Sequence, residues 1–542
     1  MHRIIALLTA LFLLCTLVGC GDDGTDKGFR LPLDGEPSQL DPQTATDASA
    51  VTVLSVLFEG LTRLDADGKA VPGAADWTVS SDKLTYTFTL RDSYWSTLSV
   101  RGETTPWDEP TRVTAQDFLF GMQRALSSDN QTGTATALYG IQNAEAVHKG
   151  DKAPSALGVR AVDDATLSIT LAAPDDAFLT KLAGTPFMPC NRAFFEYTAG
   201  RYGLEKAYIL SNGAFSLTAW NHDHSLLLHK NEHYHNADKV TPQSVRFVLD
   251  TDDKTAALTE GSLDATFLPA TDVDKARQVG VTVMPLEDSI RSVYFNTATP
   301  LLANADIRRA LRDAIEWETV YAHLTNAGEA KAIGYIPPDA TVGAERYRNG
   351  ENAVTYSTQL AAAQVALGEG LAAVYPDEPN PAVPQLTVLA AQDDVSANLA
   401  RYITQSWQKN LKVYCSLELV SEQTLAARLH SGNYQIALHS AVGGGLTAVE
   451  NLFAYTTGAA NNLAGFSDGA FDAAYAAAAR GDRAQVTAAE NVLRDLCPTV
   501  PLSFPRRYYG VGANCENVTV RSFEGGTYGG MYEFLSAKKF DD

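Results

Sequence analysis

The chain has 542 residues, too many for one ordinary domain, and this length predicts two or three domains. Its composition, 45% hydrophobic and 20% charged, is that of a globular protein and excludes a collagen-like or largely disordered chain. The 42 lysines and arginines stand against 64 aspartates and glutamates, a net charge of −22. Without a broad basic surface to neutralise phosphates, nucleic-acid binding is excluded as a function class.

The first twenty residues have the pattern of a secretory signal. Arg3 precedes an apolar run at 4–18, which is shorter than the roughly 20 residues that a membrane-spanning helix needs. The run ends in Leu-Val-Gly-Cys20, which resembles a bacterial lipobox, in which the cysteine is acylated and becomes the new first residue. We therefore expect a lipoprotein signal peptide at 1–19 and a tether at 20–27. Ordinary signal cleavage, with Cys20 incidental, is the alternative.

Hydrophobic periodicity then predicts elements in chain order. Residues 83–91 alternate apolar and polar side chains as a half-buried strand does, and a helix is expected through Ala125 with Thr114 as its N-cap. Strands are predicted at 167–171 and 226–229, with a hairpin turn at 220–225. The apolar spacing at 305–324 predicts one amphipathic helix.

Downstream, strands and helices alternate. The patterns predict strands at 385–390, 411–419 and 434–439, with a helix at 395–410 and a second helix that Ser421 caps and that ends near 430. This order is typical of a mainly parallel sheet with right-handed crossovers. Because the N-terminal half is richer in hairpins, we expect two lobes of different character with a cleft between them, where small-molecule sites usually lie.

Residues 465–469 fit G-x-S-x-G, the nucleophile elbow of α/β-hydrolases. The residues before them do not resemble a buried strand, and the last histidine of the chain, His439, precedes the serine. We therefore expect a turn in which Ser467 or Asp468 caps a helix at 471–479.

Histidines and cysteines leave two alternatives open. Five of the ten histidines lie within fourteen residues, which suits either a transition-metal site or a solvated hairpin tip: His222, His224, His229, His233 and His235. Four cysteines follow Cys20 and match no metal-binding spacing: Cys190, Cys415, Cys497 and Cys515. Export permits disulfides, and the short separation of Cys497 and Cys515 leaves a bond between them open.

A run of three glycines, 443–445, follows the predicted strand at 434–439. Glycines let another backbone approach closely or let the chain adopt positive φ. At the carboxyl end of a parallel strand this loop is well placed for ligand contact, and a turn without a ligand is the alternative.

Taken together, the sequence resembles the bacterial extracellular solute-binding proteins of family 5, the oligopeptide-, dipeptide- and nickel-binding lipoproteins of ABC importers. Two runs carry most of the resemblance, LTYTFTLR at 84–91 and VTAQDF at 113–118. Shorter runs continue it in the family order: 37–42, 57–61, 158–167, 212–215, 230–234, 261–264, 295–296, 306–316 and 462–472. The resemblance covers nearly all of the mature chain.

The resemblance implies an α/β fold of the periplasmic-binding-protein type, a two-lobe Venus flytrap hinged by two crossings of the chain. An extra hairpin-rich domain, inserted in the N-terminal lobe, is expected at 63–175. Lobe I is expected at 28–62, 176–270 and 488–542, and lobe II at 271–487. The implied ligand is an extended peptide that exchanges main-chain hydrogen bonds with the protein as an added strand.

The resemblance also implies ligand-binding residues. Residues 49–51 in the first crossing are expected to make backbone contacts with the ligand. Tyr139 would form an aromatic wall, and Asn212 with Gly213 would form the floor. Glu422 and residues 440–445 would contact the ligand from the opposing lobe. The expected residues are Ser49, Ala50, Val51, Tyr139, Asn212, Gly213, Glu422, Ser440, Ala441, Val442, Gly443, Gly444 and Gly445. No catalytic residue and no metal ligand is expected.

The chain departs from the family at the site for a free amino group. The family places a tryptophan and an aspartate after the strand at 434–439, whereas no carboxylate occurs here before Glu450. A buried ammonium needs a charged or strongly accepting partner. Glu450, carbonyls of the glycine loop, or a ligand without a free amine are the three alternatives. In addition, His235 replaces the aromatic residue that usually follows Tyr234.

We therefore expect a non-enzymatic, monomeric, cofactor-free lipoprotein, exported and lipid-anchored at the cell envelope, on the outer face of the cytoplasmic membrane or facing the periplasm. It would capture peptides and deliver them to an ABC permease and its ATPase. The same fold binding nickel, a metal chelate or another small solute is the alternative. A secreted hydrolase acting through Ser467, and a signalling or adhesion protein that reuses the fold, are the alternatives from other classes.

Overall fold

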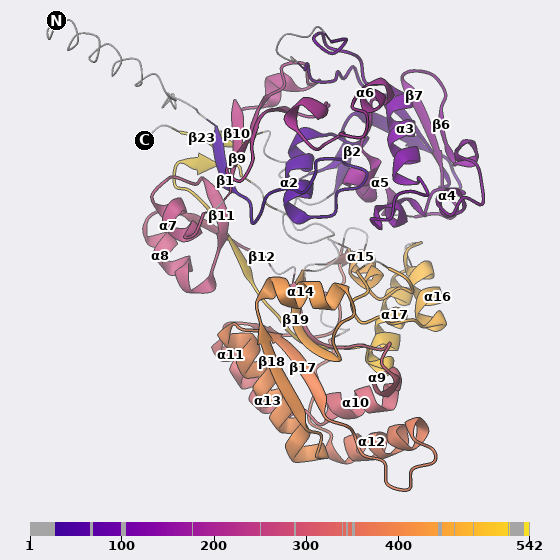
Figure 1. Cartoon of the computed structure of the whole chain (residues 1–542), viewed down its shortest axis with the longest axis vertical. Coiled ribbons are helices and arrows are strands. Elements are labelled where there is room, and N and C mark those ends of the chain that lie inside the picture. Colours follow the sequence, from indigo (N-terminus) through magenta and orange to yellow (C-terminus); the bar gives the residue numbers. More distant parts are fainter. Residues whose placement is uncertain are drawn as a thin grey trace, which may run out of the picture.

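The computed structural model describes residues 28–65, 69–98, 105–175, 177–249, 251–286, 289–338, 340–342, 345–348, 353–442, 447–459, 461–480, 482–518, 520 and 536–540. The predicted signal peptide, Cys20 and glycines 443–445 lie outside these residues. Figure 1 shows two bodies along the long axis of the molecule, an upper one in indigo and magenta and a lower one mainly in orange. We call them the first and the second lobe.

The first lobe contains two four-stranded sheets that share one hydrophobic core. One sheet has the order β1-β10-β9-β8: β1 Phe29–Pro32, β8 Phe215–Asn221, β9 Ser225–Lys230 and β10 Ser244–Val248. The other has the order β4-β5-β7-β6: β4 Ala75–Val79, β5 Thr85–Leu90, β6 Val159–Ala161 and β7 Thr166–Thr170. A short hairpin joins β2 Thr62–Leu64 to β3 Ala70–Pro72. The hairpin-rich character predicted for this half is confirmed.

Local predictions in this lobe are confirmed. In β5 the side chains of Tyr86, Phe88 and Leu90 are buried, as the alternation at 83–91 predicted. Helix α3 (Ala115–Ala125) begins with a capping box between Thr114 and Asp117. The other helices of the lobe are short, apart from α2: α2 Ala48–Leu57, α4 Ala144–His148, α5 Phe178–Lys181 and α6 Arg192–Tyr197, with 3₁₀ turns at Thr134–Leu138, Pro154–Ala156, Thr185–Phe187, Lys206–Tyr208 and Ala237–Lys239.

A three-stranded sheet of order β11-β21-β12 lies where the lobes join (Figure 1): β11 Ala265–Leu268, β12 Thr282–Leu286 and β21 Arg507–Val511. Helices α7 (Lys254–Thr259) and α8 (Val273–Gln278), with a 3₁₀ turn at Ala270–Asp272 between them, complete this region. β12 pairs with β21, whereas the strands next to them in sequence, β13 (Ser289–Phe295) and β20 (Thr499–Phe504), pair with each other in the second lobe. The chain therefore crosses between the lobes twice, side by side.

These crossings come later in the chain than the expected boundaries at 270/271 and 487/488. The expected boundaries separate β12 from the sheet in which it pairs and assign β20 to lobe I, although β20 pairs with β13 in the second lobe. The reason is that α17 (Arg483–Leu496) packs into the second-lobe core through Val486, Ala489 and Leu493, and the chain turns directly from that helix into β20.

The second lobe is built on a six-stranded sheet of order β14-β20-β13-β19-β17-β18. Its remaining strands are β14 Ala330–Lys331, β17 Leu386–Ala391, β18 Cys415–Val420 and β19 Ile436–Val442. β17 is parallel to β18 and β19, as predicted, but β13, β20 and β14 join by antiparallel pairs. The prediction of a mainly parallel sheet is therefore wrong, because β13 runs opposite to both of its neighbours, β19 and β20, and β14 runs opposite to β20.

Helices cover both faces of this sheet. They are α9 Pro300–Ala303, α10 Ala305–Asp313, α11 Trp317–Asn326, α12 Leu360–Val374, α13 Asp394–Leu411, α14 Glu422–His430, α15 Ala448–Phe453, α16 Gly469–Ala478 and α17, with short strand pairs at β15 Thr341–Val342 and β16 Glu345–Arg346. Ser421 caps α14 and Asp468 caps α16, as predicted.

Two predicted boundaries in this lobe are wrong. The helix expected at 305–324 is α10 and α11, because Asn410 Nδ2 donates to the carbonyl oxygen of Ala314 (2.8 Å) and Thr358 Oγ1 to that of Ile315 (2.6 Å), bonds that replace those of a continuous helix. The strand expected at 411–419 begins only at Cys415, because α13 continues to Leu411 and Lys412 then adopts a left-handed conformation.

The four described cysteines are free thiols, so the disulfide left open between Cys497 and Cys515 does not form. Cys497 lies in the second-lobe core, whereas Cys515 lies in the first-lobe core, in β22 (Cys515–Glu516), which pairs antiparallel with β23 (Lys538–Lys539). Among the described residues no helix is long and apolar enough to cross a membrane.

Candidate ligand-binding site

The carboxyl end of β19 has a strand partner on one side only. β19 pairs with β13 from Phe295↔Ile436 to Ser289↔Val442, but its pairing with β17 stops at Ala390↔Leu438. In the described part of the chain, no strand pairs with residues 439–442 on the β17 side. The predicted residues Ser440, Ala441 and Val442 lie on this edge, and we call residues 439–442 the open edge. Gly443, Gly444 and Gly445 lie outside the described residues.

Glu422 lies beside the open edge. It is the first residue of α14, and its side chain is 62% exposed. Its Oε1 is 3.2 Å from Nδ1 of His439, whose side chain is only 13% exposed. Helix α14 lies at the end of the second lobe that faces the first lobe (Figure 1). The structure therefore places Glu422 next to His439, which the sequence analysis did not select and which precedes Ser440 and Ala441 in β19.

Glu450, the first carboxylate after the glycines, is already bound. Its Oε2 accepts hydrogen bonds from the backbone N–H of Thr447 (2.8 Å) and from Thr447 Oγ1 (2.9 Å) in the capping box of α15. Burial raises the pKa of Glu450, while the bonds from Thr447 and the charge of Lys181 act in the opposite direction. Lys181 belongs to α5 of the first lobe and donates to Asp175 Oδ2 (2.8 Å), so this charge cluster joins the two lobes.

Ser49, Ala50 and Val51, expected in the first crossing, lie instead in the first turn of α2 within the first lobe, because the chain first crosses between β12 and β13. Ser49 and Ala50 are buried and Val51 is half-buried. The backbone N–H of Ala50 donates to Asp47 Oδ1 (2.7 Å) and that of Val51 to the Asp47 carbonyl oxygen (3.0 Å). These two N–H groups are therefore used within the helix start.

Asn212 and Gly213 hold the end of α2 in place. The Asn212 side chain accepts from the N–H of Glu59 (3.1 Å) and donates to the carbonyl oxygen of Glu59 (2.8 Å). The N–H of Gly213 donates to the carbonyl oxygen of Leu57 (2.9 Å). Asn212 is 0% exposed, so both of its amide atoms serve the fold.

Next to this contact lies a buried polar cluster that the sequence analysis did not select as a whole. The Glu59 carboxylate accepts from the hydroxyl of Tyr234 (2.5 Å) and lies 2.6 Å from Nε2 of His235. Both side chains of the Glu59–His235 pair are less than a tenth exposed. His235, which replaces an aromatic residue of the family, was the sequence signal for this cluster, because a buried histidine requires a polar partner.

Tyr139 lies apart from these residues. Its hydroxyl is 2.7 Å from Nδ1 of His148, and Nε2 of that ring is 3.1 Å from the carbonyl oxygen of Asn130. Burial and the charge of Glu145 raise the pKa of Tyr139. Its described contacts lie within the first lobe.

The histidines of the segment at 222–235 are not grouped at one site. His222 lies at the hairpin turn between Glu36 (2.6 Å) and Glu205 (3.2 Å), His229 contacts Thr218, and His235 is bound to Glu59. Among the described residues, no three His, Cys, Asp or Glu side chains are grouped as a metal site. The arrangement does not favour the alternative of a metal ligand.

The G-x-S-x-G segment is a helix cap. Asp468 Oδ1 accepts from the N–H of Phe471 (2.8 Å), and Ser467 Oγ is 3.0 Å from Thr457 Oγ1. The predicted turn is therefore confirmed.

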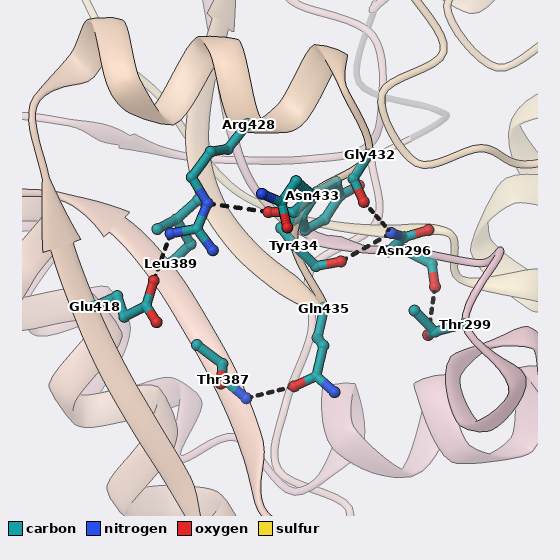
Figure 2. Close-up of a pocket in the computed structure, with 10 residues that line it drawn as sticks. All are labelled: Asn296, Thr299, Thr387, Leu389, Glu418, Arg428, Gly432, Asn433, Tyr434 and Gln435. Atoms are coloured by element: carbon teal, nitrogen blue, oxygen red, sulfur yellow. Dashed lines mark hydrogen bonds and ion pairs between the residues drawn. The ribbon is translucent and has the colours of Figure 1, made fainter.

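A small pocket lies at the opposite end of the sheet, near the amino ends of β17 and β19 (Figure 2). Its volume is about 260 Å³. Its polar groups bind one another: Gln435 Oε1 accepts from the N–H of Thr387 (2.7 Å), and Asn296 Nδ2 donates to the carbonyl oxygens of Gly432 (3.0 Å) and Tyr434 (2.8 Å). None of the predicted ligand-binding residues lines it. We therefore infer that these hydrogen bonds stabilise the segment that connects α14 to β19.

The chain passes twice between two α/β lobes, and the second lobe has an open strand edge on the face directed toward the first lobe. These features define a two-lobe solute-binding protein. The model of the bacterial extracellular solute-binding proteins, family 5, matches residues 70–462. The chain belongs to this family.

Named relatives agree with this assignment. The chain is 29% identical over 459 residues to the oligopeptide-binding protein OppA of Bacillus subtilis, covering 79% of this chain and 80% of the relative. It is 29% identical over 481 residues to the periplasmic murein peptide-binding protein MppA of Escherichia coli, covering 86% of each. The structure of the murein tripeptide-binding protein MppA superposes with a TM-score of 0.76 at 25% identity, covering 96% of this chain and 99% of MppA.

Proposed function

We propose that this chain is the substrate-binding component of an ABC import system, which captures peptides between its lobes and passes them to a membrane permease. The observation that carries this proposal is the open edge of β19. An extended peptide can add there as a further strand through main-chain hydrogen bonds, a mode that tolerates many side chains. The names of OppA and MppA, which describe peptide binding, support the same ligand class.

Within this proposal the predicted site residues have two roles. Ser440, Ala441 and Val442 bind the peptide main chain, with the three glycines beyond them and Glu422 beside them. Ser49, Ala50, Val51, Asn212 and Gly213 shape the first-lobe wall, because most of their described polar groups bind other parts of that lobe. Tyr139 contributes a more distant aromatic surface. We place the lobe boundaries at the two crossings, between β12 and β13 and between β20 and β21.

Thermal unfolding with a library of peptides of two to eight residues tests the function. We expect some peptides to raise the Tm by several degrees, because a ligand that binds only the folded state stabilises it. Amino-acid mixtures, oligosaccharides and Ni²⁺ serve as controls and should leave the Tm unchanged. A shift with one of these controls and none with any peptide would refute peptide capture.

We also propose that the protein releases its ligand unaltered and acts as a monomer. Mass spectrometry of a bound peptide after prolonged incubation should recover the original mass. A cleaved product that disappears in Ser467→Ala would instead support the hydrolase alternative.

Anchoring by a lipid on Cys20 is proposed from the sequence pattern. Two or more acyl chains give stable membrane attachment. We expect the wild type in the membrane fraction and Cys20→Ala in the soluble fraction, with the intact mass of the wild type showing the added lipid. Equal partition of both proteins would contradict the anchor.

A further inference from the structure

The described part of the chain begins beside its own carboxyl-terminal strand. Nζ of Lys539 in β23 donates to the carbonyl oxygen of Gly28 (3.4 Å), the first described residue. The same Nζ is 3.0 Å from Oδ1 of the buried Asp264, whose Oδ2 accepts from the N–H of Arg30 in β1 (2.7 Å). Figure 1 shows β23 beside β1, with α7 and α8 on the same side of the molecule. These contacts fix the position of Gly28, to which the predicted tether at 20–27 is joined.

Two apolar side chains are exposed on segments next to this point. Phe540, which follows β23, is 47% exposed, and Val279, which follows α8, is 54% exposed. The N–H of Phe540 donates to the carbonyl oxygen of Asn514 (2.9 Å), and a Cβ at Gly280 would lie 3.2 Å from the Cβ of Ala513. The segments that carry the two side chains are therefore neighbours through residues 513–514. We call the exposed residues Val279, Ala513 and Phe540 the terminal face.

The charges around the terminal face do not favour an anionic partner. On the hairpin of β22 and β23, Lys538 lies opposite Glu516. Asp541 and Asp542 follow in the sequence, and the whole chain has a net charge of −22. A partner that binds this surface is therefore recognised through apolar contact rather than through charge.

The predicted anchor brings one such partner within reach. From Cys20 to Gly28 the chain advances by eight residues, which can span no more than about 28 Å. A short tether gives a binding partner at its other end an effective concentration in the millimolar range. Single exposed apolar residues are common on protein surfaces, so the exposure of Val279 and Phe540 gains its meaning from their position next to the tether. The bilayer that carries the anchor is the partner that this position favours.

We infer that the terminal face lies on the lipid bilayer that holds the acylated Cys20, with Val279 and Phe540 in the interfacial layer of a zwitterionic membrane. This inference rests on the proposed lipid anchor. Apolar side chains gain free energy when they leave water for the boundary between headgroups and acyl chains. The contact holds the first lobe, so that closure around a ligand moves the second lobe about the two crossings.

Hydrogen exchange of the full-length, lipidated protein on phosphatidylcholine vesicles tests this inference. Cys20→Ala, mixed with the same vesicles, is the unanchored reference. We expect the amides of 278–281, 512–517 and 536–540 to exchange at least about twofold more slowly in the anchored wild type, because a face that is covered half of the time exchanges at half the rate. Helix α12 of the second lobe should exchange at the same rate in both proteins.

Two double variants separate the terminal face from exposed apolar residues in general. Val279→Ser with Phe540→Ser should remove the protection. Val162→Ser with Leu204→Ser should retain it, because these residues are similarly exposed (52% and 44%) but lie elsewhere on the first lobe. Both variants keep Cys20 and should remain in the membrane fraction, so a loss of protection reports the loss of the contact and not of the anchor.

If the lipidated wild type shows no protection, or if Val279→Ser with Phe540→Ser keeps it, the terminal face is overturned as a membrane contact while the anchor stands. Protection found only on phosphatidylglycerol vesicles would overturn apolar recognition in favour of charge. Protection of concentrated Cys20→Ala without vesicles would show that a second copy covers the face, which overturns the bilayer as its partner. If the purified wild type carries no lipid, the proposed anchor fails, and this inference fails with it.

Discussion

Two regions selected as ligand contacts by the same sequence resemblance have different structures. At the first-lobe wall, Asn212 is fully buried and both of its amide atoms bind the backbone of Glu59. At the open edge of the second lobe, Glu422 is largely exposed, and its carboxylate lies 3.2 Å from Nδ1 of His439. A buried polar group with all its hydrogen bonds made serves stability, whereas an exposed one beside an unpaired strand edge can serve binding.

Removing the Asn212 side chain should have the largest effect on stability. Asn212→Ala leaves the N–H and C=O of Glu59 buried without partners, which should lower the free energy of unfolding by about 3 kcal/mol. Urea unfolding measures this, with Asn326→Ala at the exposed end of α11 as a control that should change by less than about 0.5 kcal/mol. Unchanged stability together with lost peptide affinity would place Asn212 in the ligand site, and the first-lobe wall would then not differ in role from the open edge.

Gly213→Ala should have the next largest effect. A Cβ at this position would lie 2.7 Å from the carbonyl oxygen of Leu57, a backbone atom that cannot move without shifting α2. We expect a loss of about 2 kcal/mol in the free energy of unfolding. Gly368→Ala in α12 is the matched control: nothing lies within 4 Å of its Cβ, and the helix should gain about 0.5–1 kcal/mol. Equal effects of the two substitutions would contradict the close packing at Gly213.

A smaller, pH-dependent effect is expected at Glu450, where the lobes meet. Burial raises its pKa above the ordinary value of 4.5, so folding favours the protonated form. The wild type should therefore lose stability relative to Glu450→Gln as the pH rises from about 4.5 through the raised pKa. Calorimetric Tm measurements of both proteins over this range test the sign. The opposite slope would mean that the charge of Lys181 outweighs burial.

The smallest effect is expected at the exposed hairpin of the first lobe. Hydrogen bonds to Glu205 and Glu36 raise the pKa of His222 above its ordinary value of 6.5. The stabilisation is fully present below pH 6.5 and is lost as the pH rises through the raised pKa. Because water screens an exposed pair, His222→Ala should cost no more than about 0.5 kcal/mol, and only at low pH. NMR titration of the ring would show directly whether the pKa is raised.

Local sequence patterns were sufficient for single elements and for the family. The alternation at 83–91 and the cap at Thr114 predicted β5 and α3, because burial on one face of a strand and hydrogen bonds at a helix start depend on residues close in sequence. The motif order from 37 to 472 was sufficient for the two-lobe class.

What the sequence determined by itself was therefore the elements with local causes and the kind of fold that they build. The tertiary structure decided the rest. Residues distant in sequence break the helix at 314–316, and Asn212 supports α2 through hydrogen bonds to the backbone of Glu59, 153 residues away. The open edge exists because β17 ends before β19 does, a difference between two strands that no local pattern records. Contacts between distant residues depend on the packing of the whole lobe, so a single sequence leaves them undetermined.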